Sequence, residues 1–372
     1  MKADFFMPEY MKEFRCIGPK CKDTCCAGWD INIDEDTYKK YSKDNGELKD
    51  LVAGKYTKNN KEHDFFNAAF MNLVGEKECP FLNKDKLCNI HGGLGEENLC
   101  ITCKSYPRVY NIVDDIYEKS GLPSCEEVCR LAFLNKDKME FIEIEEEIDE
   151  DCIEIRRIID TESFMGTESL IQYFWNLRII TIAILQNREY SIEERLNILS
   201  AFYDKIEQHL NAEEFAEIDE LIEESAELNF DEFLKLGQFN EEEVYLKLKN
   251  KSLIENIKSS RLKKLAQNYL EMEKVENYLN NNDKIKATLA GYSYIYENYL
   301  VNQVFKDLIP INKVSLSLSI KRLRNSFTVI KCYLAALMIT RNNEIDEEDI
   351  LSIIQCFSKD AEHNKVFDEI LE

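Results

Sequence analysis

The sequence predicts a mostly helical α+β fold, in which a small loop-rich domain organised by cysteines and metal precedes an all-α helical domain. Ten of the 13 cysteines, nine of the 12 glycines and five of the six prolines lie before residue 130. Glycine and proline mark turns and loops, so the first part is short of regular structure. Beyond about residue 165, apolar residues recur at three- and four-residue steps, the helical period. We therefore expect a cysteine-rich domain over 1–135, an acidic linker or edge segment over 136–164, and an acidic helical domain over 165–372.

Composition narrows the classes of partner. The chain has 372 residues, 44% of them hydrophobic, which is typical of a globular protein. Its formal net charge is −24; residues 1–135 carry 19 Lys/Arg against 23 Asp/Glu, a net of −4, so the remainder carries −20. This acidity argues against a nucleic-acid partner, which needs a basic face. A basic, lysine-bearing protein partner is attracted instead, unless the charge only keeps the helical domain soluble.

Whether the cysteines form disulfides or bind metal depends on the redox state of the compartment. The stretch from Met1 to Arg15 has no basic region followed by an apolar run, so no signal peptide is expected. No window approaches the roughly 20 apolar residues of a membrane span. We therefore expect a cytoplasmic protein, with no membrane partner, whose thiols stay reduced. In that compartment, dense cysteines favour metal over disulfides.

Local patterns predict the elements of the first part. Asp34 is placed to cap a helix within 30–60, and residues 63–75 are compatible with a pair of strands. Asn83–Lys86 is typical of a turn between two short strands. Gly92–Gly95 predicts a turn before a short helix, and Asp114-Asp115 a turn between two strands.

The second part reads as helices. Residues 136–152 alternate partly, as in Ile142 to Glu145, which fits either an edge strand or an acidic linker. Beyond them, five apolar stripes have the helical period: 170–185, 215–222, 301–308, 320–337 and 350–357. We expect an all-α bundle, with Pro310 ending the third of these helices.

The cysteines form the main candidate site. Four of them lie between Cys16 and Cys26, beside polar neighbours that a buried apolar strand would not carry. Cys79 and Cys88 follow, then the C-x-x-C pair Cys100 and Cys103, and then Cys125 and Cys129 one helical turn apart. Thiolate-only sites suit zinc or an iron–sulfur cluster. Single cysteines elsewhere are interpreted as packing residues: Cys152, Cys332 and Cys356.

Spacing leaves the kind of metal site open. A zinc ribbon uses two C-x-x-C knuckles, and only one is present. The adjacent pair Cys25-Cys26 is awkward for a single tetrahedral ion, because neighbouring side chains diverge; it suits a larger cluster or two sites. The radical S-adenosylmethionine signature C-x-x-x-C-x-x-C fails, since Cys21 and Cys25 are followed by Gly28 at the third position. Gly92–Gly95 lacks the strand and helix of a dinucleotide-binding fingerprint, so it is interpreted as a turn.

Several long motifs resemble one known family. They are C-I-G-P-K-C-K-D-T-C-C-A-G-W from Cys16, C-P-F-L-N-K-D-K-L-C-N-I from Cys79, and T-C-K-S-Y-P-R from Thr102. Two more lie near the C-terminal end: E-N-Y-L-V-N-Q-V-F from Glu297 and I-Q-C-F-S-K-D-A-E-H-N from Ile354. Together they resemble the flagellin lysine-N-methylase family, FliB. The cysteine region is also similar to a broader class described as zinc- or iron-chelating.

The resemblance implies a cytoplasmic protein-lysine N-methyltransferase that acts on flagellin, with S-adenosylmethionine as methyl donor and an iron–sulfur cluster, of the 4Fe-4S kind, taking part. Zinc is the alternative metal. The alternative functions are a non-enzymatic zinc-stapled binding module and an iron–sulfur redox protein. The catalytic residues stay unknown. The implied metal ligands come from eight motif cysteines, whereas Cys100 and Cys129 look like additions in this chain: Cys16, Cys21, Cys25, Cys26, Cys79, Cys88, Cys103 and Cys125.

Aromatic residues and an arginine beside the cysteines are candidates for binding the donor. The aromatic faces of Trp29 and Tyr106, and of nearby Tyr110, suit a sulfonium cation, or else pack around the metal site. Arg108 either binds the donor's carboxylate with two hydrogen bonds or forms a structural salt bridge.

Overall fold

The computed structural model describes the following residues: 2–43, 46–61, 63–75, 78–148, 153–225, 230–236, 240–272, 279, 282–311, 315–364 and 366–372. Cys152, for which a packing role was expected, lies outside them.

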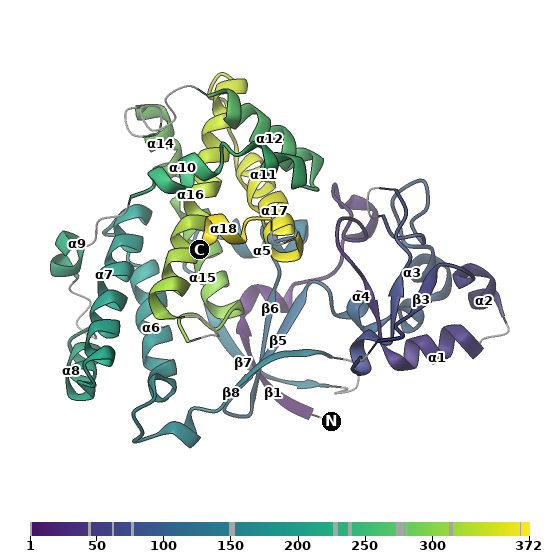
Figure 1. Cartoon of the computed structure of the whole chain (residues 1–372), viewed down its shortest axis with the longest axis horizontal. Helices are drawn as coiled ribbons and strands as arrows, with labels where there is room; N and C mark the ends of the chain where they lie inside the picture. Colours follow the sequence, from purple (N-terminus) through teal and green to yellow (C-terminus); the bar gives the residue numbers. More distant parts are fainter. Residues whose placement is uncertain are drawn as a thin grey trace.

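A five-stranded mixed sheet forms the centre of the larger part (Figure 1). Its strand order is β7-β1-β6-β5-β8. The β1–β7 and β5–β6 pairs are antiparallel, whereas β1–β6 and β5–β8 are parallel. The hairpin between β5 and β6 turns at Asp114 and Asp115, both with positive φ, as the sequence predicts. The strands are β1 (Lys2–Pro8), β5 (Arg108–Val113), β6 (Ile116–Gly121), β7 (Phe141–Glu147) and β8 (Ile155–Ile159).

The acidic segment 136–164 supplies the two outer strands of this sheet. The alternating residues Ile142 to Glu145 pair with Asp4 to Met7 of β1, so the edge-strand alternative holds for them. β8 pairs with β5 on the other side. Both edges of the sheet therefore come from one stretch of the chain.

Helices cover the sheet and extend from it (Figure 1). The buried helix α15 (Ser293–Lys306) packs on β6, α5 (Glu126–Phe133) and α6 (Phe174–Leu185). The predicted helical stripes are confirmed in α6, α8, α15, α16 and α17. The other helices of this part are α7 (Ile192–Asn211), α8 (Phe215–Ser225), α9 (Asp231–Leu236), α10 (Glu242–Lys247), α11 (Lys251–Asn256), α12 (Ser260–Glu271), α14 (Asp283–Gly291), α16 (Leu316–Thr340), α17 (Glu347–Asn364) and α18 (Asp368–Leu371).

A smaller unit lies beside this body, at the right of Figure 1. It contains a three-stranded sheet of order β2-β4-β3 and four short helices. Its elements are β2 (Asn32–Ile33), α1 (Glu35–Lys43), α2 (Glu47–Val52), β3 (Tyr56–Lys58), β4 (Ala69–Met71), α3 (Asn89–Leu94) and α4 (Ile101–Ser105). Short 3₁₀ helices complete the chain: Glu9–Lys12, Gly18–Lys20, Phe65–Asn67, Glu96–Asn98, Glu162–Phe164 and Leu170–Tyr173.

The hydrophobic cores divide the chain differently from the boundary expected at residue 135. The small unit has its own core, which includes Ile33, Tyr41 and Phe81. Residues on either side of that unit, such as Met7 and Phe133, belong instead to the large core with the helices. The reason is long-range pairing, because β1 joins β6 and β7 rather than its neighbours in sequence. The first 135 residues therefore contribute to both cores.

Local predictions in the small unit are met in part. The pair of strands expected within 63–75 was wrong, because a 3₁₀ helix and the single strand β4 occupy this stretch, and β4 pairs with β2 and β3. Leu82 and Cys88, on either side of the expected turn, form one isolated bridge rather than two strands.

Asp34 accepts a hydrogen bond from the Thr37 amide (2.8 Å) and caps α1 as expected. Asn83 accepts from the amides of Asp85 and Leu87 and closes the expected turn. The turn expected at Gly92–Gly95 was wrong, because Gly92 and Gly93 lie within α3. Only Gly95, with φ of 91°, turns the chain out of the helix.

Among the described residues, no helix combines the length and the apolar character that a bilayer crossing requires.

Candidate functional site

A cavity of about 800 Å³ lies between the small unit and the large body. Nine cysteines line it. They include all eight motif cysteines, to which the structure adds Cys100. Its walls also take residues from both cores, such as Phe81 from the small core and Phe14 from the large one. The cavity is thus a thiol-rich junction between the two parts of the molecule.

Several of these thiols lie at the N-termini of helices. Cys88, Cys100 and Cys125 occupy the N-cap positions of α3, α4 and α5. The backbone amides at a helix start carry partial positive charge and favour an anion there. Asp34 helps to place α4, because its second carboxylate oxygen accepts from the Ile101 amide at 2.8 Å. These sulfurs are therefore held where a thiolate or an anionic cluster is stabilised.

Burial raises the pKa of several of these thiols. Desolvation raises the pKa of Cys21 and of Cys125 to about 12, and that of Cys79 to about 11. The hydrogen bond between the two thiols of the C-x-x-C pair lowers the pKa of Cys100 and raises that of Cys103. A metal that binds here has to displace these protons.

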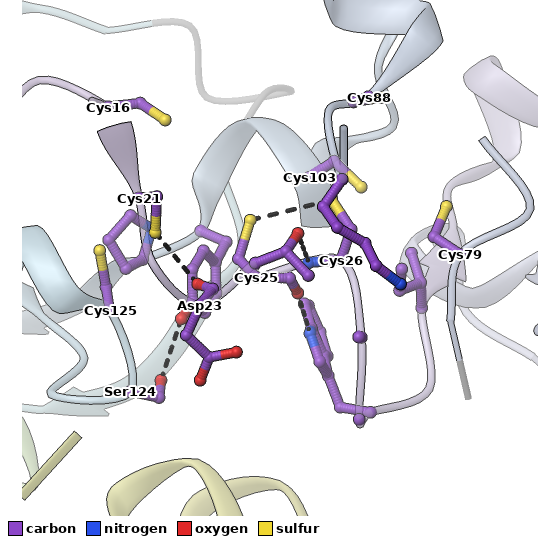
Figure 2. Close-up of a pocket in the computed structure, with 18 of the residues that line it drawn as sticks. Cys16, Cys21, Asp23, Cys25, Cys26, Cys79, Cys88, Cys103, Ser124 and Cys125 are labelled. Carbon is purple, nitrogen blue, oxygen red and sulfur yellow. Dashed lines mark hydrogen bonds between the residues drawn. The ribbon is translucent and has the colours of Figure 1, made fainter. Parts of the chain in front are cut away.

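The thiols fall into two groups on opposite sides of Cys25 (Figure 2). Cys16, Cys21 and Cys125 lie on one side, and the thiols of Cys21 and Cys125 interact electrostatically. On the other side, the interacting thiols are Cys26, Cys79, Cys88, Cys100 and Cys103. Cys25 interacts with both sides, and its sulfur lies 3.8 Å from that of Cys26.

Within the described part of the chain, no three Cys, His, Asp or Glu side chains converge as they would around one metal ion. A multinuclear cluster makes a different demand, because each cysteine binds a different iron atom. Nine thiols spread around one cavity fit that demand better than they fit a single tetrahedral ion.

Helix α17, close to the C-terminal end, holds the Cys21–Cys26 segment in place. Lys359 donates to the Asp23 carboxylate and to the Thr24 carbonyl, both at 3.0 Å. Gln355 donates to the other Asp23 oxygen at 3.0 Å and to the Ser124 carbonyl at 2.9 Å. The two side chains tie both the Cys21–Cys26 segment and the residue before Cys125 to the helical body. We call these contacts of Asp23 with Gln355 and Lys359 the α17 clasp.

The predicted aromatic residues form one wall of the cavity. The rings of Trp29 and Tyr106 stack at 5.7 Å between centroids. Trp29 donates to the Cys25 carbonyl at 2.7 Å, and Tyr106 contacts the Ser124 hydroxyl at 3.2 Å. Tyr110 is not part of this wall, because its ring packs against Phe5 in the large sheet.

Three arginines also line the cavity, and only Arg108 was predicted from the sequence. The Arg108 guanidinium lies over the Phe14 ring, 5.1 Å from its centroid. Arg15 donates to the Phe14 carbonyl at 2.7 Å, and Arg261 to the Ser352 hydroxyl at 2.6 Å. Among the described residues these three are bonded to neutral groups, although the protein as a whole is strongly acidic.

The remaining described cysteines are structural. Cys129 is buried in the large core, and its thiol donates to the Pro123 carbonyl at 2.9 Å. Cys332 and Cys356 are fully buried in the same core, which confirms the packing interpretation for them. Cys100 differs from Cys129, because its thiol reaches the cavity although neither residue belongs to the motif pattern.

By its fold and cavity, the chain is a mostly helical α+β protein with a thiol-lined cavity between two hydrophobic cores. Comparison with known proteins then identifies the family. The model of the FliB lysine N-methylase C-terminal domain matches residues 178–372, more than half of the chain. The protein belongs to the FliB lysine N-methylase family.

Curated relatives come from Salmonella. The lysine-N-methylases of Salmonella typhimurium and Salmonella choleraesuis are each 26% identical over 216 residues, which cover 57% of this chain and 48% of theirs. The flagellar biosynthetic protein FliU of Salmonella muenchen is 32% identical over 136 residues, covering 36% of this chain and 78% of its own length. The chain thus spans about half the length of the two methylases. No solved structure matches it.

Proposed function

We propose that this protein is a protein-lysine N-methyltransferase that uses S-adenosylmethionine and an iron–sulfur cluster. The observation that carries the proposal is the single cavity lined by nine cysteines, in a chain of the lysine N-methylase family. The family supports the reaction, and the thiols support the cofactor.

The donor set of the cavity fits an iron–sulfur cluster. We propose Cys16, Cys21, Cys25 and Cys125 as ligands of a 4Fe-4S cluster, because they surround one end of the cavity beside the aromatic wall. Tyr106 interacts electrostatically with Cys125 and Cys25, which places the aromatic pair next to these thiols. When bound, such a cluster supplies one-electron redox chemistry. Zinc is the alternative occupant of the thiols.

The aromatic wall and the arginines suit the two charged ends of the methyl donor. The stacked faces of Trp29 and Tyr106 attract the sulfonium cation. Arg108 and Arg15 are placed to bind the donor's carboxylate, since an arginine donates two parallel hydrogen bonds to that group. Both arginines also stand among neutral partners, so binding the carboxylate breaks no ion pair among the described residues.

The reaction moves one methyl group. The sulfonium carbon–sulfur bond breaks as a carbon–nitrogen bond forms at the lysine Nζ, and S-adenosylhomocysteine leaves with the electron pair. The amine must first lose a proton to solvent, because its ordinary pKa is about 10.4. A nearby sulfonium and an apolar wall lower that pKa, since both disfavour a second positive charge.

We propose flagellin as the protein substrate. The support is the flagellar name of the FliU relative and the resemblance of the motifs to flagellin methylases. Residues 136–372, with their net charge of −20, attract a lysine-bearing surface. The described cysteines carry no disulfide, which fits a reducing compartment, and we place the reaction in the cytoplasm.

The proposal is tested by incubating anaerobically purified, reduced protein with flagellin and methyl-labelled S-adenosylmethionine. We expect labelled methyl groups on flagellin lysines, identified by peptide mass spectrometry. No transferred label, together with stoichiometric zinc in a colourless protein, would instead support a zinc-stapled binding module. Iron without methyl transfer would support a redox protein.

The donor site has its own test. Replacing Arg108 with Gln removes a charged partner of the carboxylate, so S-adenosylmethionine should bind about 10- to 100-fold more weakly. Isothermal titration of the metal-loaded protein measures this. Lys104→Gln, on the same cavity wall but without a planar fork of donors, is the matched control and should change affinity little. Equal affinity in Arg108→Gln and the wild type would remove Arg108 from the donor site.

A further inference from the structure

One face of helix α17 carries buried oxygen atoms that accept no hydrogen bond from a described residue. They belong to the side chains of Gln355, Ser358 and Glu362. Spacings of three and four residues place these side chains in one row, with successive Cβ atoms about 5–6 Å apart. Buried polar oxygens are normally satisfied, by ordered water where no protein group reaches them. A bridging water joins two oxygens about 5–6 Å apart, so this row is suited to hold a chain of waters.

The row begins at the wall of the cavity. Gln355 donates to the Ser124 carbonyl at 2.9 Å, and the Ser124 hydroxyl lies 3.2 Å from the Tyr106 hydroxyl. Tyr106 and Ser124 both line the cavity, where Ser124 stands beside Cys125 (Figure 2). Two hydroxyl groups in hydrogen-bond contact therefore connect the aromatic wall to the first member of the row.

The row ends at Glu362, inside the molecule. Both of its carboxylate oxygens are buried, and the Lys306 ammonium lies 3.4 Å from one of them. Lys306 is closer to Asp307, because it donates to both oxygens of that carboxylate at 2.9 Å. Glu362 thus shares its cation with a nearer carboxylate and keeps the capacity to accept hydrogen bonds.

The surroundings of Glu362 favour the uptake of a proton. Burial raises its pKa above the ordinary value, and the Asp307 carboxylate adds to this effect. Lys306 and Arg156 lower the pKa, but burial is the larger influence. The other titratable groups that face Glu362 are the hydroxyls of Tyr106 and Tyr299 and the thiol of Cys129. A carboxylate in such a setting is a better proton acceptor at neutral pH than an exposed one.

We propose that Glu362 receives the proton that the substrate lysine loses, by way of the Tyr106 and Ser124 hydroxyls and of waters held along α17 by Gln355 and Ser358. The N–H bond of the lysine ammonium breaks and its electron pair stays on Nζ, ready to attack the methyl group. The proton forms an O–H bond at Glu362 and later passes to solvent. This inference rests on the proposed function, since it concerns the proton of the same reaction.

The pH profile of methyl transfer tests the path. In single turnovers at about pH 7, Glu362→Gln should transfer methyl groups to flagellin about 100-fold more slowly than the wild type. The difference should shrink as the pH rises towards about 9.5, because lysine, with a pKa of about 10.4, then loses its proton to water without help. Metal content and the KM for S-adenosylmethionine should stay at the wild-type values.

The matched control is Glu297→Gln. Glu297 is a buried carboxylate paired with Arg188 and Arg195, outside the cavity, so this variant should keep the wild-type pH profile whatever its stability. A rate of Glu362→Gln within about twofold of the wild type at about pH 7 would overturn the proposal, as the expected loss is far larger. So would a loss that stays the same at every pH, because that is the result of a purely structural role.

A second variant covers the case in which Glu362→Gln does not fold. Ser358→Ala removes one oxygen of the row and leaves the carboxylate in place, so transfer at about pH 7 should slow by about tenfold and recover at high pH. Equal profiles for Ser358→Ala and the wild type would then overturn the proposal. No transfer by the wild type would overturn the proposed function together with this inference. Transfer by the wild type and equal transfer by Glu362→Gln would overturn this inference alone.

Discussion

At the scale of single residues, Asp23 is the residue around which the cysteine segment is arranged. Its carboxylate accepts from both Gln355 and Lys359, and the latter side chain is only 12% exposed. The α17 clasp therefore joins residues more than 330 positions apart in sequence. Since both partners are partly shielded from water, this ion pair is worth more than a surface pair.

Breaking the clasp should loosen the thiols. We expect Lys359→Met to lower the free energy of unfolding by about 1–3 kcal/mol, because it leaves the Asp23 carboxylate without its cation. It should also speed alkylation of Cys21 and Cys25, measured by peptide mass spectrometry. Lys22→Met is the control, because its ion pair with Glu348 is exposed on both sides and should leave both readouts unchanged. Equal alkylation rates in the two variants would contradict a positioning role for Lys359.

Sequence reasoning identified the cavity thiols but not the residues that hold them. All eight motif cysteines line one cavity. They could be identified from the sequence because they are dense and stand among polar residues. Gln355 and Lys359 lie within the motif that begins at Ile354, but neither they nor Arg15 carry a local signal of a role at the cavity. Each is an ordinary polar residue, and its position at the cavity depends on how distant helices pack.

At the scale of elements, helix α15 carries the motif that begins at Glu297, and its contacts show a structural role for that motif. The polar residues of its motif are buried and bonded to other elements. Glu297 pairs with Arg188 and Arg195, both at 2.8 Å. Asn302 accepts from the Tyr10 hydroxyl at 2.6 Å and donates to the Gly121 carbonyl at 3.1 Å. These residues join helices to the sheet and line no part of the cavity.

The motif on α15 should therefore be structural. Asn302→Ala removes two hydrogen bonds and leaves the Tyr10 hydroxyl buried without its acceptor, which should cost about 1–3 kcal/mol of unfolding free energy. Metal content should stay at the wild-type value. Urea denaturation and metal analysis measure the two quantities. Asn256→Ala, at an exposed residue bonded only within its own helix, is the control. Loss of metal from folded Asn302→Ala would show that the motif acts on the cavity.

The sheet and α6 are linked by a buried ion pair. Arg178 binds Glu118 with two hydrogen bonds of 2.6 and 2.8 Å, and both side chains are almost fully buried. Arg178→Met should destabilise the protein by about 3–5 kcal/mol, since it leaves a buried carboxylate unpaired. Thermal and urea unfolding check this. Lys39→Met, which breaks an exposed pair with Glu35, should not shift the midpoint. A similarly small shift for Arg178→Met would contradict the account.

The helices and strands differed in how well they could be predicted from the sequence alone. Helical periodicity located α6, α15, α16 and α17, because each has a long apolar stripe. The partners of β1 were not predictable, since its pairing with β7 joins residues about 140 positions apart. The helix through Gly92 and Gly93 was missed for another reason. Local propensity opposes it, and the packing of Ile90 in the small core outweighs that propensity.

At the scale of the whole molecule, two hydrophobic cores meet at a cavity lined by thiols. The large core is extensive and includes most of the helical part, whereas the small core has only twelve buried hydrophobic residues among those that the structure describes. Metal should therefore matter more to the small unit than to the large one.

Removing metal should unfold the molecule unevenly. After anaerobic chelation, we expect proteolysis to cut within residues 30–100 at least ten times faster, because opening of the small unit loses its cross-links. Cleavage within α15 and α16 should change little. Fragment mass spectrometry at short times gives both rates. Uniform acceleration across the chain would show that the two parts unfold together.

We propose that the thiol-lined cavity is the active site of a lysine methylase. The most direct measurement compares methyl transfer from labelled S-adenosylmethionine to flagellin by the wild type, Cys21→Ser and Cys129→Ser under anaerobic conditions. The account predicts transfer by the wild type and by Cys129→Ser, and loss of transfer in Cys21→Ser. Equal transfer by all three proteins, or none by the wild type, would contradict it.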